Sequence, residues 1–383
     1  MKLSIIGSTR PGFELPTEQA LIFSGHEAGI CYMPEDINTL LSEPDETALR
    51  RANGTLKSGH HSVMGHASYN FVIEGAPKII AMLLNNEQEY YTSEKSARYT
   101  TMKTTDQEQK IYEKWITKFE TLISKKYPQI DKKVVHKLAL ENARYFISVF
   151  TPSTVMGYTV NLRQANYLIK WCKDLAFSNC ENPFLEQLSP FLIELASLLT
   201  QKISVNNLYD NQGRSFTLFS NRKREDEFGE NYCISYEGTF SQLAQAQRHR
   251  SLYYEMQIPD SANAKFYIPP IISSSEDRDE YLVDMNQLAS RFPQGMLVKI
   301  NERGTAENFC KKCHERLCGA AQREICIRTH DTLELYLRQA EGRNPEIHQL
   351  LSKFKDKTKC QFGHYQCDRP CPLGPAMAFE RLI

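Results

Sequence analysis

The chain has 383 residues, of which 46 are basic and 46 are acidic, so its formal net charge is zero. Hydrophobic residues make up 41% of the sequence and charged residues 24%, which is typical of a globular protein and argues against a disordered chain. The neutral balance argues against a generally basic nucleic-acid-binding protein. The sequence has no apolar run of the ~20 residues that span a bilayer and no hydrophobic signal segment. A cytoplasmic protein of two domains is therefore expected, with no membrane partner.

Two stretches of the sequence repeat one pattern. Residues 69–91 and 232–254 each contain an alternating stretch, a Glu-Gly pair, a helical pattern and a Tyr pair, in the same order. Each stretch predicts a strand, a turn and a helix. The sequence therefore predicts a tandem duplication, with a first repeat over residues 1–205 and a second over 206–383 that ends in a Cys-rich tail.

Two further pairs of segments support the duplication. Asn142-Ala143-Arg144 resembles Ala289-Ser290-Arg291, and residues 160–163 (Val-Asn-Leu-Arg) resemble residues 300–303 (Ile-Asn-Glu-Arg). Both pairs follow the first repeated stretch in the same order, so chance matches are a poor explanation. A polar, Asn-rich joint at about residues 205–215 is expected to separate the repeats.

Helical periodicity dominates the sequence between these landmarks. In chain order the predicted helices cover residues 107–126, 132–150, 158–176, 190–203, 280–292 and 308–339. Their aromatic residues recur at helical spacing, which is typical of core packing. The predicted fold class is α+β, with helices dominant.

One cationic cluster has the composition of an anion-binding site. Arg248-His249-Arg250 ends a helical segment that contains Gln245. Two guanidinium groups beside an imidazole suit a phosphate or an electron-rich ring, although a solvated helix end is the simpler interpretation. The first repeat lacks this cluster but carries Ser96 and Arg98, whose spacing places both side chains on one face of an extended segment. The two repeats thus hold different halves of an anion-binding set.

Seven of the eleven cysteines follow residue 300. In a cytoplasmic protein such a cluster favours thiols or metal ligands over disulfides. A structural zinc with four thiolates is the preferred interpretation, and an iron–sulfur cluster and buried free thiols are the alternatives. The predicted zinc ligands are Cys313, Cys318, Cys360 and Cys367.

Three histidines, His60, His61 and His66, precede the first repeated strand. Their density raises the possibility of a metal. Because no Asp or Cys lies among them, a polar contact to a ligand or a structural role is the preferred interpretation.

The motifs resemble those of the flavin-dependent thymidylate synthases. His60 to Tyr99 is similar to that family's His-rich loop, aromatic strand and Ser-x-Arg-Tyr segment, but Asn85-Asn86-Glu87 stands where the family has Arg-His-Arg. The second half keeps Arg-His-Arg and lacks Ser-x-Arg. It later runs from Arg316 to Ile325, which is similar to the family's helix with Ala-Gln-Trp-Glu-Ile, with Arg323 in place of Trp. The resemblance covers nearly the whole chain as two diverged copies and implies an antiparallel sheet in each.

The resemblance also implies that one site draws residues from unlike repeats. In the family, one unit supplies the Gln and Arg-His-Arg, and its neighbour supplies Ser-x-Arg. Arg316 would be catalytic, stabilising negative charge on a pyrimidine ring. The implied nucleotide-binding residues are Gln245, Arg248, Arg316, Glu94, Ser96, Arg98 and Arg144, and the implied flavin-binding residues are Arg248, His249, Arg250, His60, Asn161 and Arg163. A homodimer acting as a pseudo-tetramer is expected.

The implied activity is a reductive methylation. NADPH would reduce FAD, and methylenetetrahydrofolate would supply a one-carbon unit to C5 of dUMP or a related pyrimidine nucleotide. A non-catalytic flavin- or nucleotide-binding homologue is the first alternative. The second is a zinc-stabilised nucleic-acid binder, which is weak because acidic residues balance the charge and few aromatics interleave its basic residues. Those basic residues are Lys311, Lys312, Arg316, Arg323 and Arg328.

Overall fold

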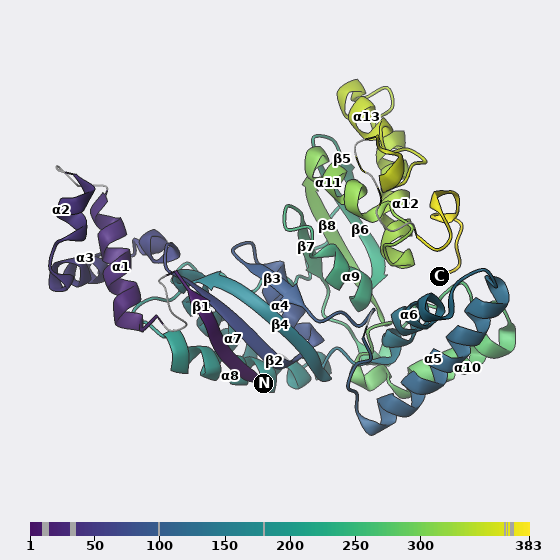
Figure 1. Ribbon diagram of the computed structural model, residues 1–383, viewed down its shortest axis with the longest axis horizontal. Coiled ribbons are helices and arrows are strands. Elements are labelled where there is room, and N and C mark those ends of the chain that lie inside the picture. The colour runs from purple at the N-terminus through teal and green to yellow at the C-terminus, as the bar shows by residue number, and fades with distance from the viewer. Residues whose placement is uncertain are drawn as a thin grey trace. The chain divides into compact units, whose positions relative to one another are not determined.

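The structure is a computed structural model that describes residues 1–9, 15–30, 36–98, 100–178, 181–363, 365, 367 and 371–383 (Figure 1). It divides into two compact units. The first comprises Met1–Lys95 and Pro152–Phe216, and the second comprises Ser96–Thr151 and Thr217–Ile383. Each unit contains one four-stranded antiparallel sheet.

The sheet of the first unit has the strand order β1-β2-β4-β3. Its strands are β1 (Lys2–Ser8), β2 (Ser68–Pro77), β3 (Tyr91–Glu94) and β4 (Pro152–Asn161). Every second side chain of β2, from Tyr69 through Phe71 to Ile73, is buried, as expected for a sheet with one face on the core. The helices of this unit are α1 (Thr17–Ile30), α2 (Ile37–Leu41), α3 (Asp45–Lys57), η1 (His61–Gly65), α4 (Lys78–Asn86), α7 (Leu162–Ala176) and α8 (Pro183–Ile203).

The sheet of the second unit has the order β5-β6-β8-β7. Its strands are β5 (Glu227–Phe228), β6 (Asn231–Thr239), β7 (Tyr253–Met256) and β8 (Leu297–Thr305). Two helices, α5 (Asp106–Lys126) and α6 (Lys132–Ala143), come from the first half of the chain. The other helical segments are η2 (Arg144–Phe146), α9 (Phe240–Ala246), η3 (Ser261–Asn263), α10 (Ser275–Gln287), η4 (Ala289–Arg291), α11 (Ala306–Arg316), α12 (Arg323–Ala340), α13 (Pro345–Ser352), η5 (Lys359–Gln361) and η6 (Pro375–Met377).

The two sheets share one topology, in which the fourth strand in sequence lies between the second and the third. In both units a helix, α4 or α9, directly follows the long second strand, as the repeated sequence pattern predicts. The predicted fold class is confirmed: both units combine helices with an antiparallel sheet, and the two sheets have the same strand order.

Strand pairing corrects one of the sequence alignments. Asn161 pairs with Ser68 at the first position of β2, and Thr305 pairs with Asn231 at the first position of β6. Each of these residues also caps the next helix, because Asn161 accepts from the backbone of Gln164 and Thr305 accepts from that of Asn308. Asn161 therefore corresponds to Thr305, and its alignment with Asn301 was wrong.

Several predicted helix bounds also change. Residues 158–161 belong to β4, so α7 begins only at Leu162. The prediction starts this helix too early because the alternating pattern of β4 runs directly into the helical pattern of α7. The predicted helix 308–339 is two helices, because a connector over residues 317–322 separates α11 from α12. The predicted helix 132–150 ends as α6 at Ala143, where a short 3₁₀ turn takes over.

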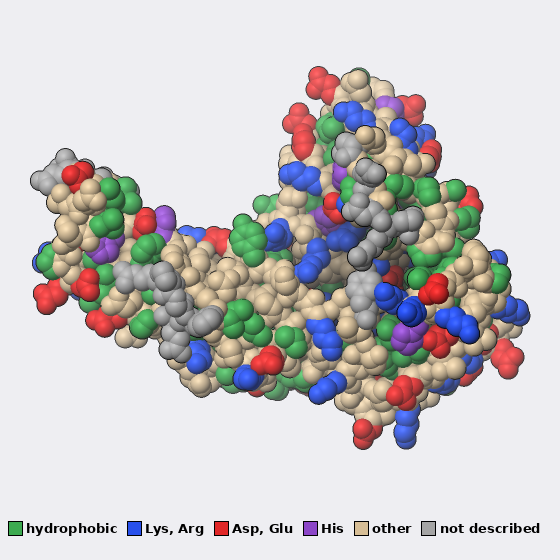
Figure 2. Space-filling view, in the orientation of Figure 1, with side chains coloured by type: hydrophobic (Ala, Val, Ile, Leu, Met, Phe, Trp, Pro, Cys, Tyr) green, Lys and Arg blue, Asp and Glu red, His purple; other side chains and the backbone are tan. Residues whose placement is uncertain are grey.

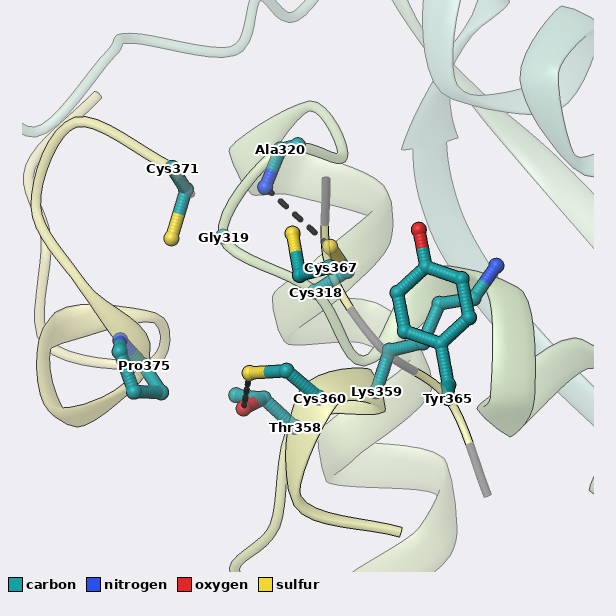
Figure 3. Close-up of a pocket in the computed structure, with 10 residues that line it drawn as sticks. All are labelled: Cys318, Gly319, Ala320, Thr358, Lys359, Cys360, Tyr365, Cys367, Cys371 and Pro375. Carbon is teal, nitrogen blue, oxygen red and sulfur yellow. Dashed lines mark hydrogen bonds between the residues drawn. The ribbon is translucent and has the colours of Figure 1, made fainter. Parts of the chain in front are cut away.

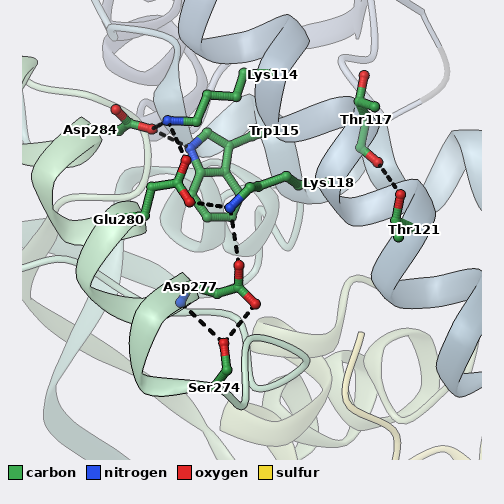
Figure 4. Close-up of polar contacts among 9 residues, drawn as sticks. All are labelled: Lys114, Trp115, Thr117, Lys118, Thr121, Ser274, Asp277, Glu280 and Asp284. Atoms are coloured by element: carbon green, nitrogen blue, oxygen red, sulfur yellow. Dashed lines mark hydrogen bonds and ion pairs between the residues drawn. The ribbon is translucent and has the colours of Figure 1, made fainter.

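Helix α5 is fastened to α10 by apolar and charged contacts (Figure 4). The ring of Trp115 meets that of Tyr281 edge-on at 5.0 Å between centroids, and its Nε1 donates to Asp284 at 2.7 Å. Lys114 and Lys118 add ion pairs to the acidic face of α10. The compact units therefore depart from the predicted domain ranges 1–205 and 206–383, since residues 96–151 pack with the second half.

Basic and acidic side chains alternate over the visible surface, in line with the zero net charge (Figure 2). Among the described residues, no helix combines the length and apolar character needed to cross a bilayer.

Candidate functional site

The connector over residues 317–322 is held by two arginines of the second unit. Arg98 donates to the carbonyl of Ala320 at 2.7 Å, and Arg381 donates to the carbonyls of Gly319 and Ala321. These bonds satisfy carbonyl groups that a continuous helix would have paired internally. The break between α11 and α12 is thus a fixed structure stabilised by guanidinium groups from two distant segments.

Gln322, the last residue of the connector, joins both halves of the chain. Its side-chain oxygen accepts from Arg144 and from Gln245, and its amide nitrogen donates to the hydroxyl of Tyr145. The side chain is only 2% exposed. Gln322 therefore holds Arg144 next to α9, the helix that precedes Arg248-His249-Arg250.

Glu324 extends this network to the start of α9. It accepts from the backbone and hydroxyl of Thr239, at 2.9 and 2.7 Å, and from the hydroxyl of Tyr145 at 2.9 Å. Burial raises the pKa of Glu324, although the hydrogen bonds oppose that shift. Thr239 in turn caps α9 through the backbone of Gln242. The network fixes α9 against α12.

Arg316, at the end of α11, contacts the end of α9. Its Nε donates to Nε2 of His249 at 2.7 Å, and a terminal nitrogen donates to the carbonyl of Gln245 at 3.2 Å. Burial, and then the charges of Arg316 and Lys312, lower the pKa of His249 to about 2. The imidazole is therefore neutral and accepts at Nε2, so it orients Arg316 without cancelling its charge.

Burial also lowers the pKa of Arg316, and the charges of Arg98 and Arg248 act in the same direction. Arg98 and Arg248 come from other segments of the chain, and their charges act on the guanidinium of Arg316. Arg98 alone among these three forms an ion pair with a carboxylate in the described chain, that of Glu141.

Arg144 is 7% exposed. Burial and the charge of Arg98 lower its pKa, whereas the charges of Glu141, Tyr145 and Glu324 oppose this shift. Among the described residues no carboxylate lies within ion-pair distance of it, and its Nε has no hydrogen-bond partner. The side-chain oxygen of Gln245 is also buried and without a partner within the described chain. A buried cation in this state is unfavourable unless a ligand supplies the missing anion. The arrangement fits a small anionic molecule that also carries a hydrogen-bond donor.

The structure brings one group of predicted site residues together in the second unit, namely Arg98, Arg144, Gln245, Arg248, His249 and Arg316. Ser96 belongs to the same unit, and its hydroxyl accepts from the backbone of Arg98 at 3.3 Å. Arg250, like Arg248, is exposed at the end of α9.

The other predicted residues lie in the first unit. His60 is exposed just before η1. Asn161 and Arg163 both donate to the carboxylate of Glu89. Glu94 accepts from Lys78 at 2.7 Å.

The predicted metal ligands separate. Cys318, Cys360 and Cys367 line one cavity of about 540 Å³, together with Cys371 (Figure 3). Cys313 is fully buried within α11 and does not line that cavity. The fourth cysteine of the group is therefore Cys371, because the C-terminal segment turns back toward the connector.

Sequence reasoning passed over Gln322, Glu324 and Tyr145 as site residues. The first two lie in the segment from Arg316 to Ile325 that resembles the family's helix, and Tyr145 directly follows Arg144, so a sequence signal was present. Their role depends on contacts between distant segments, which no local pattern reveals.

Comparison with known proteins places residues 19–173 in a match to the family model "Thymidylate synthase complementing protein". The resemblance to the flavin-dependent thymidylate synthases is confirmed. The matched residues include Ser96, Arg98 and Arg144, whereas Gln245, Arg248 and Arg316 lie beyond them.

Two solved structures resemble the chain in part. The flavin-dependent thymidylate synthase ThyX of Helicobacter pylori, complexed with FAD and dUMP, is 17% identical over 53% of this chain and 100% of its own, with a TM-score of 0.31. The UMP/dUMP methylase PolB of Streptomyces cacaoi, bound with 5-Br dUMP, is 15% identical over 52% of this chain and 90% of its own, with a TM-score of 0.32. No curated protein matches the chain.

Proposed function

We propose that the chain is an FAD-dependent enzyme that methylates C5 of dUMP, or of a related pyrimidine nucleotide, with methylenetetrahydrofolate as the carbon source. The observation that carries this proposal is Arg144, a buried cation that faces Gln245 and Gln322 and lacks a carboxylate partner within the described chain. A nucleotide monophosphate supplies the missing negative charge.

The nucleotide site is proposed to be composite within one chain. Ser96, Arg98 and Arg144 bind the phosphate, because guanidinium groups match phosphate oxygens with paired donors. Gln245 contributes its unpartnered oxygen as an acceptor for a ring N–H. The first three residues come from one repeat and Gln245 from the other, which the shared contact at Gln322 supports.

Arg316 is the proposed catalytic residue. Its guanidinium stabilises negative charge that develops on the pyrimidine when a ring nitrogen ionises. His249 and the carbonyl of Gln245 hold the guanidinium in place before the reaction, so no reorientation is required. One such preorganised donor contributes on the order of 3 kcal/mol to barrier lowering.

The end of α9 fits a flavin cofactor. Arg248 and Arg250 are exposed there, with neutral His249 between them, and guanidinium groups suit the diphosphate of a flavin dinucleotide. His60, Asn161 and Arg163 are proposed as further flavin contacts, with His60 on the folate side. When bound, FAD supplies the hydride chemistry, with NADPH as the reductant. The protein is left to bind, orient and polarise the nucleotide, and a homodimer acting as a pseudo-tetramer is the proposed assembly.

One observation favours a second candidate, a flavin- or nucleotide-binding protein without turnover. In the first unit the carboxylate of Glu89 accepts hydrogen bonds from both Asn161 and Arg163. These contacts compete with any role of the two residues in binding the cofactor. Turnover, not binding, separates this candidate from the enzyme.

The test begins with the absorbance spectrum of the purified protein and the quantification of flavin released on denaturation. About one FAD per chain is expected, since one composite site forms per chain, and flavin oxidation should then require both dUMP and methylenetetrahydrofolate. Arg248→Ala should strip flavin, while Arg338→Ala, a change on the exposed end of α12, should not. Absence of flavin after incubation with excess FAD would overturn the proposal. Flavin without nucleotide-dependent oxidation would favour the second candidate.

A further inference from the structure

Four cysteines line the cavity of about 540 Å³ in the second unit, although they come from three segments (Figure 3). Cys318 belongs to the 317–322 connector, Cys360 to η5, and Cys367 and Cys371 to the C-terminal segment. Convergence of four thiols on one cavity does not follow from chain proximity. It results from the packing of the C-terminal segment against the connector.

One contact of the cysteines suits a metal-bound thiolate. The backbone N–H of Ala320 donates to Sγ of Cys318 at 3.4 Å. Hydrogen bonds to cysteine sulfurs are one of the means by which proteins tune such centres.

Gly319 shows how closely the segments approach. A Cβ atom at this position would lie 2.6 Å from Sγ of Cys371 and 3.2 Å from its Cβ, so any other residue would collide with the cysteine. The sulfur of Cys371 is thus packed against the backbone of the connector. The same residue follows Cys318 directly, which brings the two cysteines to one edge of the cavity.

We propose that Cys318, Cys360, Cys367 and Cys371 bind an iron–sulfur cluster, for which four soft thiolates are suitable ligands. No three of their sulfur atoms lie within 4.8 Å of one another, so the four thiols are too far apart for a single zinc ion. The cavity is larger than a single ion fills, and the spacing Cys367-x3-Cys371-Pro372 matches the end of a known cluster-binding run.

The metal centre also holds the nucleotide site in place, an inference that rests on the proposed function. Cys318 is two residues from Arg316 and four from Gln322, so it anchors the connector between Arg316, at the end of α11, and Gln322. Cys360, Cys367 and Cys371 would tie that connector to the C-terminal segment. Loss of the metal would release the connector and loosen the nucleotide-binding residues at its two ends.

Metal content of the full-length protein, purified without oxygen, tests the first part. Iron with an equal amount of acid-labile sulfide is expected, and zinc in place of iron would contradict the cluster. Cys318→Ser and Cys371→Ser should each remove the iron, whereas Cys233→Ser, in β6 of the same unit, should retain it. Because a variant can fail to fold, thiol labelling of the wild-type protein provides a second measure: removal of the cluster should expose four additional thiols. A wild-type protein that holds no iron and sulfide, and that takes up neither when both are supplied, overturns the proposal.

Titration with dUMP then tests the link to the nucleotide site. The metal-free protein should bind dUMP about 10-fold more weakly than the loaded protein, as for other supporting contacts of metal sites. Equal affinity in both forms would overturn the link and leave the metal centre intact. If neither form binds dUMP, the proposed function fails, while the metal analysis still supports the four-cysteine centre.

Discussion

The two sheets share a strand order, yet the helices that follow their second strands end in opposite ways. Helix α4 ends in Asn85-Asn86-Glu87, and all three residues are buried. Helix α9 is followed by Arg248-His249-Arg250, and both arginines are exposed. One backbone arrangement therefore buries amides and a carboxylate in the first unit and leaves cations exposed in the second. The comparison shows that this fold does not determine the site.

The partners of the cations differ as well. Arg163 in the first unit donates to the carboxylate of Glu89. Arg316 and Arg144 in the second unit donate to neutral groups, the imidazole of His249 and the amide of Gln322. A carboxylate cancels the charge of its partner, whereas a neutral acceptor orients the guanidinium and leaves its charge available. This difference explains why we place the working site in the second unit.

The largest effect is expected for Arg316→Ala. Turnover should fall by about 10²–10³-fold, because the preorganised donor at the pyrimidine is lost, while the FAD content stays unchanged. Steady-state oxidation of reduced flavin, with FAD quantified in the same sample, measures both. Arg338→Ala provides the matched control on an exposed helix end. Retained turnover in Arg316→Ala would show that this residue is not catalytic. The difference drawn between the cations of the two units would then lose its functional meaning.

Arg144→Met should weaken dUMP binding without lowering the stability of the ligand-free protein. We expect dUMP to bind roughly 10²-fold more weakly, because a buried charge partner of the phosphate is removed. The ligand-free protein should be as stable as the wild type or more stable, since a buried cation with no carboxylate at ion-pair distance in the described chain is replaced by an apolar side chain of similar length. Isothermal titration and thermal unfolding provide the two readings.

The second repeat offers the control for this variant. Arg291, which the sequence alignment pairs with Arg144, ends η4; its side chain is 36% exposed and lies 3.9 Å from the carboxylate of Glu108. Arg291→Met should leave dUMP affinity unchanged and reduce stability slightly. Equal losses of affinity in both variants would show that Arg144 acts on the fold rather than on the ligand.

Much of this arrangement was accessible from the sequence. The repeated Glu-Gly pattern located β2 with α4 and β6 with α9, because alternation and helical periodicity are local signals. Complementary losses in the two repeats pointed to Arg144 and Gln245 as partners, and their side chains do share the oxygen of Gln322.

Other features depend on contacts that no local pattern encodes. The association of residues 96–151 with the second unit results from the packing of Trp115 on Tyr281. The break between α11 and α12 is held by Arg98 and Arg381, which are far away in sequence. Cys371 replaced Cys313 in the cysteine group because a helical cysteine faces its own core while the C-terminal segment folds back.

The smallest effect is expected for Glu89→Gln, which tests the first unit. Burial alone would raise the pKa of Glu89, but hydrogen bonds from Arg163 and Asn161 outweigh it, so the pKa in the folded state is lowered. The ionised carboxylate therefore contributes stability above the unfolded-state pKa of about 4.3, and this contribution disappears as the pH falls through the lowered folded-state pKa. Because the side chain is 42% exposed, solvent limits the contribution to at most about 1 kcal/mol.

Urea unfolding of the wild type and of Glu89→Gln over a range of pH measures this difference directly. The two proteins should differ at neutral pH and converge in acid. Turnover should stay within about twofold of the wild type, because the change removes one surface ion pair and leaves Arg163 and Asn161 in place. A fall of tenfold or more in turnover or flavin content would mean that Glu89 itself supports the working site, and the two units would then differ in degree rather than in kind.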